Sequence, residues 1–447
     1  MKARVRRSAL LAVVVAIALI TSGCWRVGNL DGPGTGGLEG RTGDSVNVDK
    51  SVVVVPVGVY QVPVITYADP ISHRLRVGVD RVGTGWHFDD LDGPGTGSVN
   101  GRTGNDVGTF NSAALGVGAA GPGRSIDVYY FDSTSSRLRH GHFNGGPDAA
   151  TAWNFDDVDG PGTTLAGHTE DLAGKFNAAS FYAGHPDDLY LAVAQKQLKP
   201  TGRLRHTWFD GTSHFEDVDG IGGVCVGQTD HDVGSYTAAQ PDGVALHAFY
   251  YDATAHTLRH ARWNGSTWTC ETLDGAGGGG GRVTDDVGQY ISTTMTPDGH
   301  LHVFYLDATT HRLRHGNFDG STSTWTFENL DGPGVAGGAG RTAHMVGSST
   351  AAAPNAPGSV IDVLYSDDTA HSLRHGRFDG STWTFETIDG TGSLTVGRTS
   401  DQVGQYNAIA YGGTPIELQM WTGDLTSGNL RSGCSFGPGI PPPAACS

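Results

Sequence analysis

The stretch Trp383-Thr384-Phe385-Glu386-Thr387-Ile388-Asp389-Gly390 decides the fold, because seven versions of it occur along the 447-residue chain. Each version, here called the cassette, ends in Asp-Gly. The closing aspartates are Asp31, Asp92, Asp159, Asp219, Asp274, Asp331 and Asp389. A tryptophan stands six residues earlier in every version but one, where Ser213 replaces it: Trp25, Trp86, Trp153, Trp268, Trp325 and Trp383. Such recurrence predicts a repeat architecture rather than separate domains.

Two further motifs recur in the same phase. A Leu-Arg pair occurs at Leu75-Arg76, Leu138-Arg139, Leu204-Arg205, Leu258-Arg259, Leu313-Arg314, Leu373-Arg374 and Leu430-Arg431. Gly-Arg-Thr or a close variant of it begins at Gly40, Gly101, Gly167, Gly227, Gly281, Gly340 and Gly397. Three independent counts therefore agree on seven units.

Each unit has the composition of four short strands. In the unit from 281 to 331 these are expected at 289–295, 301–307, 312–318 and 325–331, with turn residues between them. Seven four-stranded antiparallel units around an axis make an all-β, seven-bladed β-propeller, which closes its sheets into a ring and leaves no long exposed edge. An open solenoid is the alternative, but it would leave the first cassette unpaired.

The phase of the repeats predicts how the ring closes. The cassette at 25–31 follows no other strands, and the last unit ends without a cassette, so 25–31 should complete the last blade. The expected blades are 41–92, 102–159, 168–219, 228–274, 282–331, 341–389, and 398–431 together with 25–31. The expected domains are a lipoprotein-type signal peptide at 1–23, the propeller at 24–434 and a Pro-rich tail at 435–447.

Residues 1–23 have the pattern of an export signal: a basic start, then an apolar run from 9 to 20 that is short for a membrane span. The ending Thr21-Ser22-Gly23-Cys24 resembles the lipobox of bacterial lipoproteins, although Thr21 stands where leucine is usual. This resemblance implies lipidation of Cys24 and anchoring to the outer face of the cell membrane or to the outer membrane. Ordinary signal cleavage, with secretion, is the alternative.

Charge argues against one class of partner. The net charge is −17, and removal of the four basic residues within 1–23 lowers it to −21. Such a surface repels phosphate backbones, so nucleic acid is not an expected partner, and we expect a monomer.

Four cysteines remain beyond Cys24, an even number that allows two disulfides in an exported protein. Cys434 and Cys446 flank the Pro-rich tail and are expected to pair. Cys225 and Cys270 then form the second pair, with a buried free thiol at Cys270 as the alternative.

The unit Asp307-Ala308-Thr309-Thr310-His311-Arg312-Leu313-Arg314-His315-Gly316-Asn317-Phe318-Asp319-Gly320, with Trp325-Thr326-Phe327-Glu328, resembles the repeats of bacterial secreted propellers. These are grouped with sialidase-like and fucose-lectin-like domains. The resemblance covers almost all of 25–434 and defines a blade rather than an activity. It implies a carbohydrate site between adjacent blades.

Such a site would use aromatic rings to stack on sugars, with arginine and carboxylate groups bonding the hydroxyls. The candidates are Trp86, Trp153, Trp268, Trp325, Trp383, Arg76, Arg139, Arg259, Arg314, Arg374, Glu271, Glu328 and Glu386. The structural alternative has the tryptophans packed between sheets, and each Leu-Arg arginine paired across its hairpin with the acid three residues before the closing aspartate.

The Gly-Arg-Thr loops join consecutive blades and should all lie on one face of the propeller, where binding loops are common. Arg102, Arg282, Arg341 and Arg398 are candidates there. The alternative is that these arginines bridge neighbouring loops.

We expect no metal or other cofactor. Acidic runs such as Asp89-Asp90-Leu91-Asp92 offer oxygen ligands for Ca²⁺ without a full binding motif, and the histidines after Leu-Arg are interpreted as structural surface positions. Almost every acid and arginine belongs to a repeated register, whereas glycoside hydrolysis needs a unique carboxylate pair. The sequence therefore predicts a non-catalytic, lectin-like carbohydrate-binding module at the cell envelope. The alternatives are a protein-interaction or structural propeller, whose partner is an extracellular or envelope protein, and a sialidase-like glycoside hydrolase.

Overall fold

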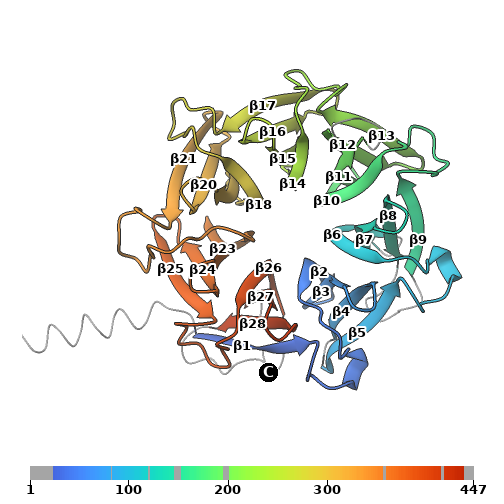
Figure 1. Cartoon of the computed structure of the whole chain (residues 1–447), viewed down its shortest axis with the longest axis horizontal. Helices are drawn as coiled ribbons and strands as arrows, with labels where there is room; N and C mark the ends of the chain where they lie inside the picture. The colour runs from blue at the N-terminus through green and yellow to red at the C-terminus, as the bar shows by residue number, and fades with distance from the viewer. Residues whose placement is uncertain are drawn as a thin grey trace, which may run out of the picture.

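The chain folds into a ring of seven four-stranded antiparallel sheets, as predicted (Figure 1). The structure, a computed structural model, describes residues 24–81, 83–118, 121–144, 153–194, 201–355, 359–413 and 417–436. The expected signal peptide and most of the expected tail lie outside these residues. Within the described part, no helix has the length and apolar character needed to span a membrane.

In six blades the strands run in chain order from the central channel to the rim, and in blade 7 the first strand of the chain takes the rim position (Figure 1). Blade 1 consists of β2 (Val48–Val57), β3 (Tyr60–Asp69), β4 (Arg74–Arg81) and β5 (Gly85–Asp92). Blade 2 consists of β6 (Val107–Gly118), β7 (Gly121–Asp132), β8 (Arg137–Asn144) and β9 (Trp153–Asp159). Blade 3 consists of β10 (Leu172–Tyr182), β11 (His185–Val193), β12 (Gly202–Phe209) and β13 (Ser213–Asp219).

Blade 4 consists of β14 (Val233–Pro241), β15 (Leu246–Asp252), β16 (Thr257–Trp263) and β17 (Trp268–Asp274). Blade 5 consists of β18 (Val287–Met295), β19 (Leu301–Asp307), β20 (Arg312–Asp319) and β21 (Thr324–Asp331). Blade 6 consists of β22 (Ala351–Asn355), β23 (Val360–Asp367), β24 (Ser372–Phe378) and β25 (Trp383–Asp389). Blade 7 consists of β26 (Val403–Gly412), β27 (Glu417–Asp424), β28 (Leu430–Phe436) and β1 (Cys24–Asp31). Short 3-10 turns, η1 (Leu38–Gly40) and η2 (Val99–Gly101), lie in two connecting loops.

The ring closes through the N-terminal strand. β1 pairs antiparallel with β28, Trp25 opposite Ser435 and Val27 opposite Gly433. Figure 1 shows blue β1 lying along red β28 at the rim. The first cassette is therefore the fourth strand of blade 7, which confirms the expected closure.

The core lies between blades. Trp383 and Phe385 of β25, two residues apart on one strand face, are buried with Phe304 of blade 5, so one hydrophobic cluster spans two blades. The same arrangement recurs around the ring and confirms the packing interpretation of the tryptophans. Packing against neighbours on both sides removes the apolar faces of every sheet from water.

Each rim strand carries a bulge near its end. In blade 1, Leu75 lies opposite Asp92 but Arg76 lies opposite Asp90, so Leu91 is an extra residue. The same shift occurs at the Leu-Arg pair of blades 2 to 6. A bulge moves every later residue by one position relative to its partner strand, and this shift decides which acid meets which arginine.

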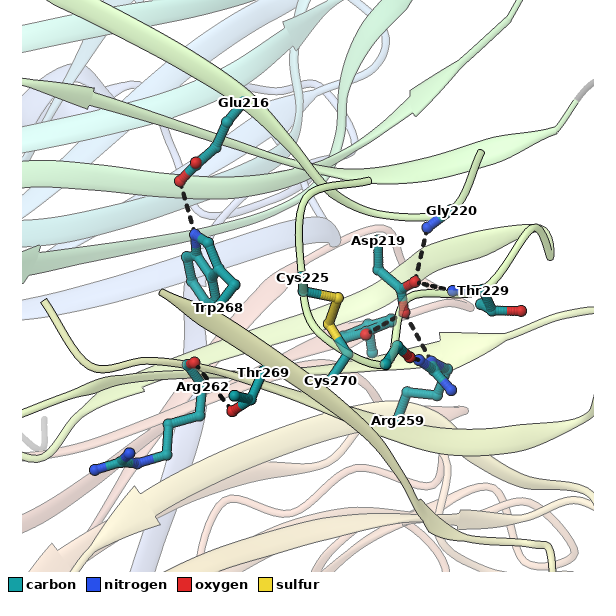
Figure 2. The surroundings of a disulfide bond; sticks show 12 residues. Glu216, Asp219, Gly220, Cys225, Thr229, Arg259, Arg262, Trp268, Thr269 and Cys270 are labelled. Atoms are coloured by element: carbon teal, nitrogen blue, oxygen red, sulfur yellow. Dashed lines mark hydrogen bonds and ion pairs between the residues drawn. A yellow bond between two sulfur atoms is a disulfide. The ribbon is translucent and has the colours of Figure 1, made fainter. Parts of the chain in front are cut away.

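Cys225 and Cys270 form the predicted disulfide, which ties the loop before blade 4 to its rim strand (Figure 2). In blade 5, Gly316 leaves room for Phe327, whose ring would lie 2.7 Å from any Cβ at that glycine. In blade 4, Cys270 stands at the cassette position of Phe327 and lies opposite Ala261. Because cysteine is smaller than phenylalanine, the space that the phenylalanine ring would fill is available to the disulfide. Cys446 lies outside the described residues, so its pairing with Cys434 stays a prediction.

Candidate functional site

Each cassette aspartate is buried between two blades and links them. Asp274, the last residue of the rim strand of blade 4, accepts at Oδ2 hydrogen bonds from Tyr305 (2.6 Å) and Arg314 (2.7 Å) of blade 5. Its Oδ1 accepts the backbone N–H groups of Gly275 and Val283, both at 2.9 Å, which holds the following loop. All seven aspartates are fully buried, so they are structural groups rather than surface ligands.

The candidate arginines belong to these junctions. Arg76, Arg139, Arg259, Arg314 and Arg374 are all buried, and each reaches the aspartate of the preceding blade. Burial by itself would lower the pKa of the Arg76 guanidinium, but Tyr67, Asp90 and Asp31 outweigh it and raise that pKa.

The expected partner of these arginines within the blade was wrong by one residue. Arg76 pairs with Asp90 rather than Asp89, and Arg314 donates to Asn329 at 2.8 Å rather than to Glu328. The bulge in the rim strand causes the shift, because it turns the residue after the expected acid toward the arginine.

The cassette glutamates bind histidines instead. Glu386 Oε1 lies 3.0 Å from His375 Nδ1 and accepts Trp25 Nε1 of the next blade at 2.9 Å. Glu271 pairs likewise with His260, and Glu328 with His315. The interpretation of these histidines as surface positions is therefore wrong: together with Glu and Trp they seal the contact between blades.

The candidate tryptophans face this packed interior. Trp86, Trp153, Trp268 and Trp383 are buried and Trp325 is half-buried, packed against Phe249 and His260. A sugar ring would have to displace a blade to stack on them. The groups expected to form an interblade carbohydrate site are thus used to hold the blades together.

The loop arginines make similar contacts. Arg282 donates from Nε to the carbonyl of Leu273 at 2.7 Å, and its guanidinium lies over Phe327 of the next blade. Arg102 and Arg341 repeat both contacts, whereas Arg398 is exposed and reaches the Thr395 carbonyl at 3.4 Å. Three of the four loop candidates therefore bridge the loop to the next blade.

The central channel contains an arrangement that the sequence did not predict. Five aromatic residues from the innermost strands surround a cavity of about 370 Å³, and we call them the crown: Phe110, Phe176, Tyr236, Tyr290 and Tyr406. Neighbouring rings touch, with centroids 4.8 Å apart for Phe110 and Phe176 and again for Tyr236 and Tyr290. Asp49 and Ser349 take the same position in the remaining two blades.

Every crown residue has a strained backbone. Their φ angles are 53, 54, 56, 54 and 51°, in the left-handed region that bulky side chains avoid. Each sits in a bulge of its strand, and such strain costs on the order of 1–3 kcal/mol per residue. Bulges re-aim side chains, and strained residues concentrate where a fold holds a ligand, so the crown is the best candidate site.

Amide side chains support the strained backbone. Asn177 Nδ2 donates to the carbonyls of Phe110 (2.9 Å) and Gly174 (3.0 Å), and Asn111 and Asn407 make equivalent bonds. Within the described chain, Asn177 Oδ1 has no hydrogen-bond partner although it is buried beside the cavity.

Blade 1 breaks the symmetry of the channel with charge. Asp49 accepts the backbone N–H of Phe110 at 3.0 Å, and burial raises its pKa. Lys50 donates to the Asn47 carbonyl at 2.8 Å and lies 5.5 Å from the centre of the Tyr406 ring. Burial lowers the pKa of Lys50 to about 7, so its charge changes near neutral pH.

The crown had a sequence signal. Five blades contain Gly, one variable residue and then Phe or Tyr, at Gly108, Gly174, Gly234, Gly288 and Gly404, each seven residues after the first residue of the Gly-Arg-Thr motif. Strict period-two alternation treats these aromatics as ordinary strand residues. The bulges that turn them into the channel are not visible in that pattern.

The chain is thus a seven-bladed β-propeller with an aromatic-lined central channel. No protein-family model and no curated protein matches its sequence. Solved structures resemble it only distantly. The fucose-specific lectin from Aleuria aurantia, a six-bladed propeller, is 13% identical over 79% of this chain and 98% of that one, with a TM-score of 0.43.

Enzymes resemble the chain to the same degree. An oligogalacturonate lyase in complex with manganese is 10% identical over 89% of this chain and 99% of that chain, with a TM-score of 0.48. A polysaccharide lyase is 10% identical over 93% of this chain and 97% of that chain, with a TM-score of 0.46. These likenesses concern the general architecture. The blade count comes from this chain's own sheets, and no site residue is transferred from these proteins.

Proposed function

We propose that this propeller is a non-catalytic carbohydrate-binding module, and that its site is the crown in the central channel rather than the clefts between blades. The observation that carries the proposal is the ring of five strained aromatic residues around a cavity of about 370 Å³. Aromatic rings stack on the apolar faces of sugars, and cavities of roughly 300–1,000 Å³ suit small ligands.

Polar groups at the same place fit the hydroxyls of a sugar. Tyr236, Tyr290 and Tyr406 offer phenol groups, and the Gln405 side chain lines the same cavity. Among the described residues that line the cavity, Asp49 is the only acid. Glycoside hydrolysis requires two carboxyl groups about 5–10 Å apart, so binding suits this site better than turnover.

Glycine substitutions test the site. Tyr290→Gly and Tyr406→Gly remove a ring from the crown while fitting the left-handed backbone, so the thermal unfolding temperature should change little. After a glycan array has identified a ligand, titration calorimetry should show each variant binding it about 3- to 10-fold more weakly.

Trp325→Phe is the matched control, because Trp325 packs between blades and not in the channel. It should retain full affinity. Binding that survives both glycine variants but is lost in Trp325→Phe would move the site back to the blade interface. A folded protein that binds no saccharide would refute carbohydrate binding altogether.

A protein partner is the second candidate, favoured by exposed apolar side chains on the loops between blades. Val99, Val224, Val226, Leu394 and Val396 are all exposed there, on the loops that carry the Gly-Arg-Thr motifs. Replacing Val226 and Leu394 with serine should abolish capture of such a partner and leave saccharide binding by the crown unchanged.

We further propose that the chain is exported and held at the outer face of a bacterial membrane by lipid on Cys24. The support is the basic and apolar leader of residues 1–23 and its lipobox-like ending. Nucleic acid is no expected partner of so acidic a chain.

A further inference from the structure

The junction between blades 2 and 3 differs from the other junctions in what covers its central side chain. In four junctions the cassette tryptophan of one blade packs against the histidine that follows Leu-Arg in the preceding blade. The pairs are Trp268 with His206, Trp325 with His260, Trp383 with His315, and Trp25 with His375. Blade 3 has Ser213 in place of tryptophan, so His140 of blade 2 lacks the cassette ring that packs on the other four histidines.

Without the cassette ring, His140 is more exposed than its counterparts. Its side chain is 15% exposed, against 4–6% for the four covered histidines. A second histidine, His142, stands two residues further along β8 on the same face of the strand and is 36% exposed. No other blade has histidines at both of these positions, because the residues that correspond to His142 are Val79, Trp208, Arg262, Asn317, Arg377 and Cys434.

A buried carboxylate faces both rings. Asp127 of β7 is 2% exposed, and its Oδ1 lies 2.8 Å from His140 Nε2 and 2.8 Å from His142 Nδ1. All three ligand atoms lie within 4.8 Å of one another. In a zinc site with bonds of about 2.0–2.1 Å, neighbouring ligand atoms are about 3.3 Å apart, so each Asp127–histidine distance would lengthen by about half an ångström around the ion.

We propose that Asp127, His140 and His142 form a binding site for a divalent transition metal ion, with Zn²⁺ as the representative ligand. Two imidazoles and one carboxylate suit Zn²⁺, Ni²⁺ or Fe²⁺ better than Ca²⁺, which prefers oxygen ligands. The exposed side of His142 leaves at least one coordination position open to water or to a ligand atom. The ring of Tyr129, stacked on His140 at 4.5 Å, fixes the imidazole in place.

Zinc titration of the untagged, folded full chain tests the proposal. Competition with a chromophoric chelator at pH 7.5 should give one Zn²⁺ per chain with a Kd below about 10 µM. His142→Gln and Asp127→Asn should each weaken binding by at least about 100-fold, because each removes one of three ligands. His315→Gln is the matched control: it removes the corresponding histidine of a covered junction and should leave the affinity unchanged.

The reverse substitution tests the role of the missing ring. Ser213→Trp restores the cassette residue and should cover His140, weakening Zn²⁺ binding by at least about tenfold while the chain keeps its thermal stability without metal. If His142→Gln binds Zn²⁺ as well as the unaltered chain, or if the unaltered chain binds none, Asp127 merely holds two imidazoles and the metal site is refuted. Circular dichroism of each variant separates loss of the site from loss of the fold.

Discussion

His375 shows how a single side chain couples this fold to pH. It is buried between blades 6 and 7, 2.7 Å from Asp362 and 3.0 Å from Glu386. Burial by itself would lower the pKa of His375, but the hydrogen bonds to Asp362 and Glu386 outweigh it and raise that pKa to about 9. At neutral pH the histidine is therefore a buried cation between two carboxylates.

Stability should fall as the solution becomes alkaline. A histidine whose pKa is about 9 in the folded chain and about 6.5 in the unfolded chain stabilises the fold fully below pH 6.5. That contribution, at most about 3 kcal/mol, is lost as pH rises through 9. Urea unfolding of His375→Gln between pH 6.5 and 9 should show a smaller decline in the free energy of unfolding than the unaltered chain.

His302→Gln is the control for this experiment. Burial, and the nearby His315, lower the pKa of His302 to about 3, so its effect lies below pH 6.5, where the unfolded chain takes up a proton that the folded chain does not. The variant should keep the alkaline decline of the unaltered chain. An identical alkaline decline in His375→Gln and the unaltered chain would contradict the assignment of a charged His375.

Among the elements, β1 has a role that no other rim strand has. Other rim strands are joined to their blade by a hairpin, whereas β1 is held to β28 only by pairing and side-chain contacts. Trp25 adds two contacts from β1 to blade 6, because it packs on His375 of β24 and donates to Glu386 of β25. Loss of this ring would therefore loosen the closure itself.

Trp25→Ala should lower the free energy of unfolding by about 3–5 kcal/mol and speed amide exchange in β1 and β28. Trp325→Ala removes the same cassette residue from a blade whose strands are joined by hairpins. It should lower stability without changing exchange in β1 and β28. Equal exchange of those two strands in both variants would show that the closure does not depend on Trp25.

The repeat registers predicted the elements, because a blade needs its tryptophan, its Leu-Arg pair and its loop at fixed spacing. The count of seven and the role of residues 25–31 followed from that spacing alone. The contacts at Arg76 and Glu328 did not follow, because one bulged residue shifts the partner without altering the sequence period. The same limit hid the crown, since the bulge at Tyr290 reverses the direction that simple alternation gives it.

At the scale of the whole molecule, Asp49 and Ser349 leave the aromatic ring of the channel incomplete, and Ser213 leaves one blade junction uncovered. The repeated residues account for the architecture, whereas the residues that depart from the repeat distinguish one part of the channel and one blade junction from the others. The proposed metal site was absent from the sequence-based expectations because the two histidines lie on β8 and the aspartate lies on β7. Only the pairing of these two strands in the folded blade brings the three side chains together.

Lipid attachment would make Cys24 essential for membrane association. Cys24→Ala should move the protein from the membrane fraction to the soluble exported fraction while its saccharide affinity remains unchanged. Immunoblotting of fractionated cells measures the first effect, and mass spectrometry of the N-terminal peptide detects the lipid directly. Equal amounts of both proteins in the membrane fraction would contradict the anchor.

The position of β1 has a geometric consequence for such an anchor. Because β1 begins at Cys24 itself, no spacer would separate the lipid from the rim of the ring. Rim strands run toward the face of the Gly-Arg-Thr loops, so Cys24, at the start of β1, lies at the opposite face. The innermost strands begin at the loop face, and the crown lies in their first half, so the crown is near the loops. A tether this short would act as an orienting device: it would set one face of the disc against the bilayer and hold the mouth of the channel outward, toward whatever approaches the cell.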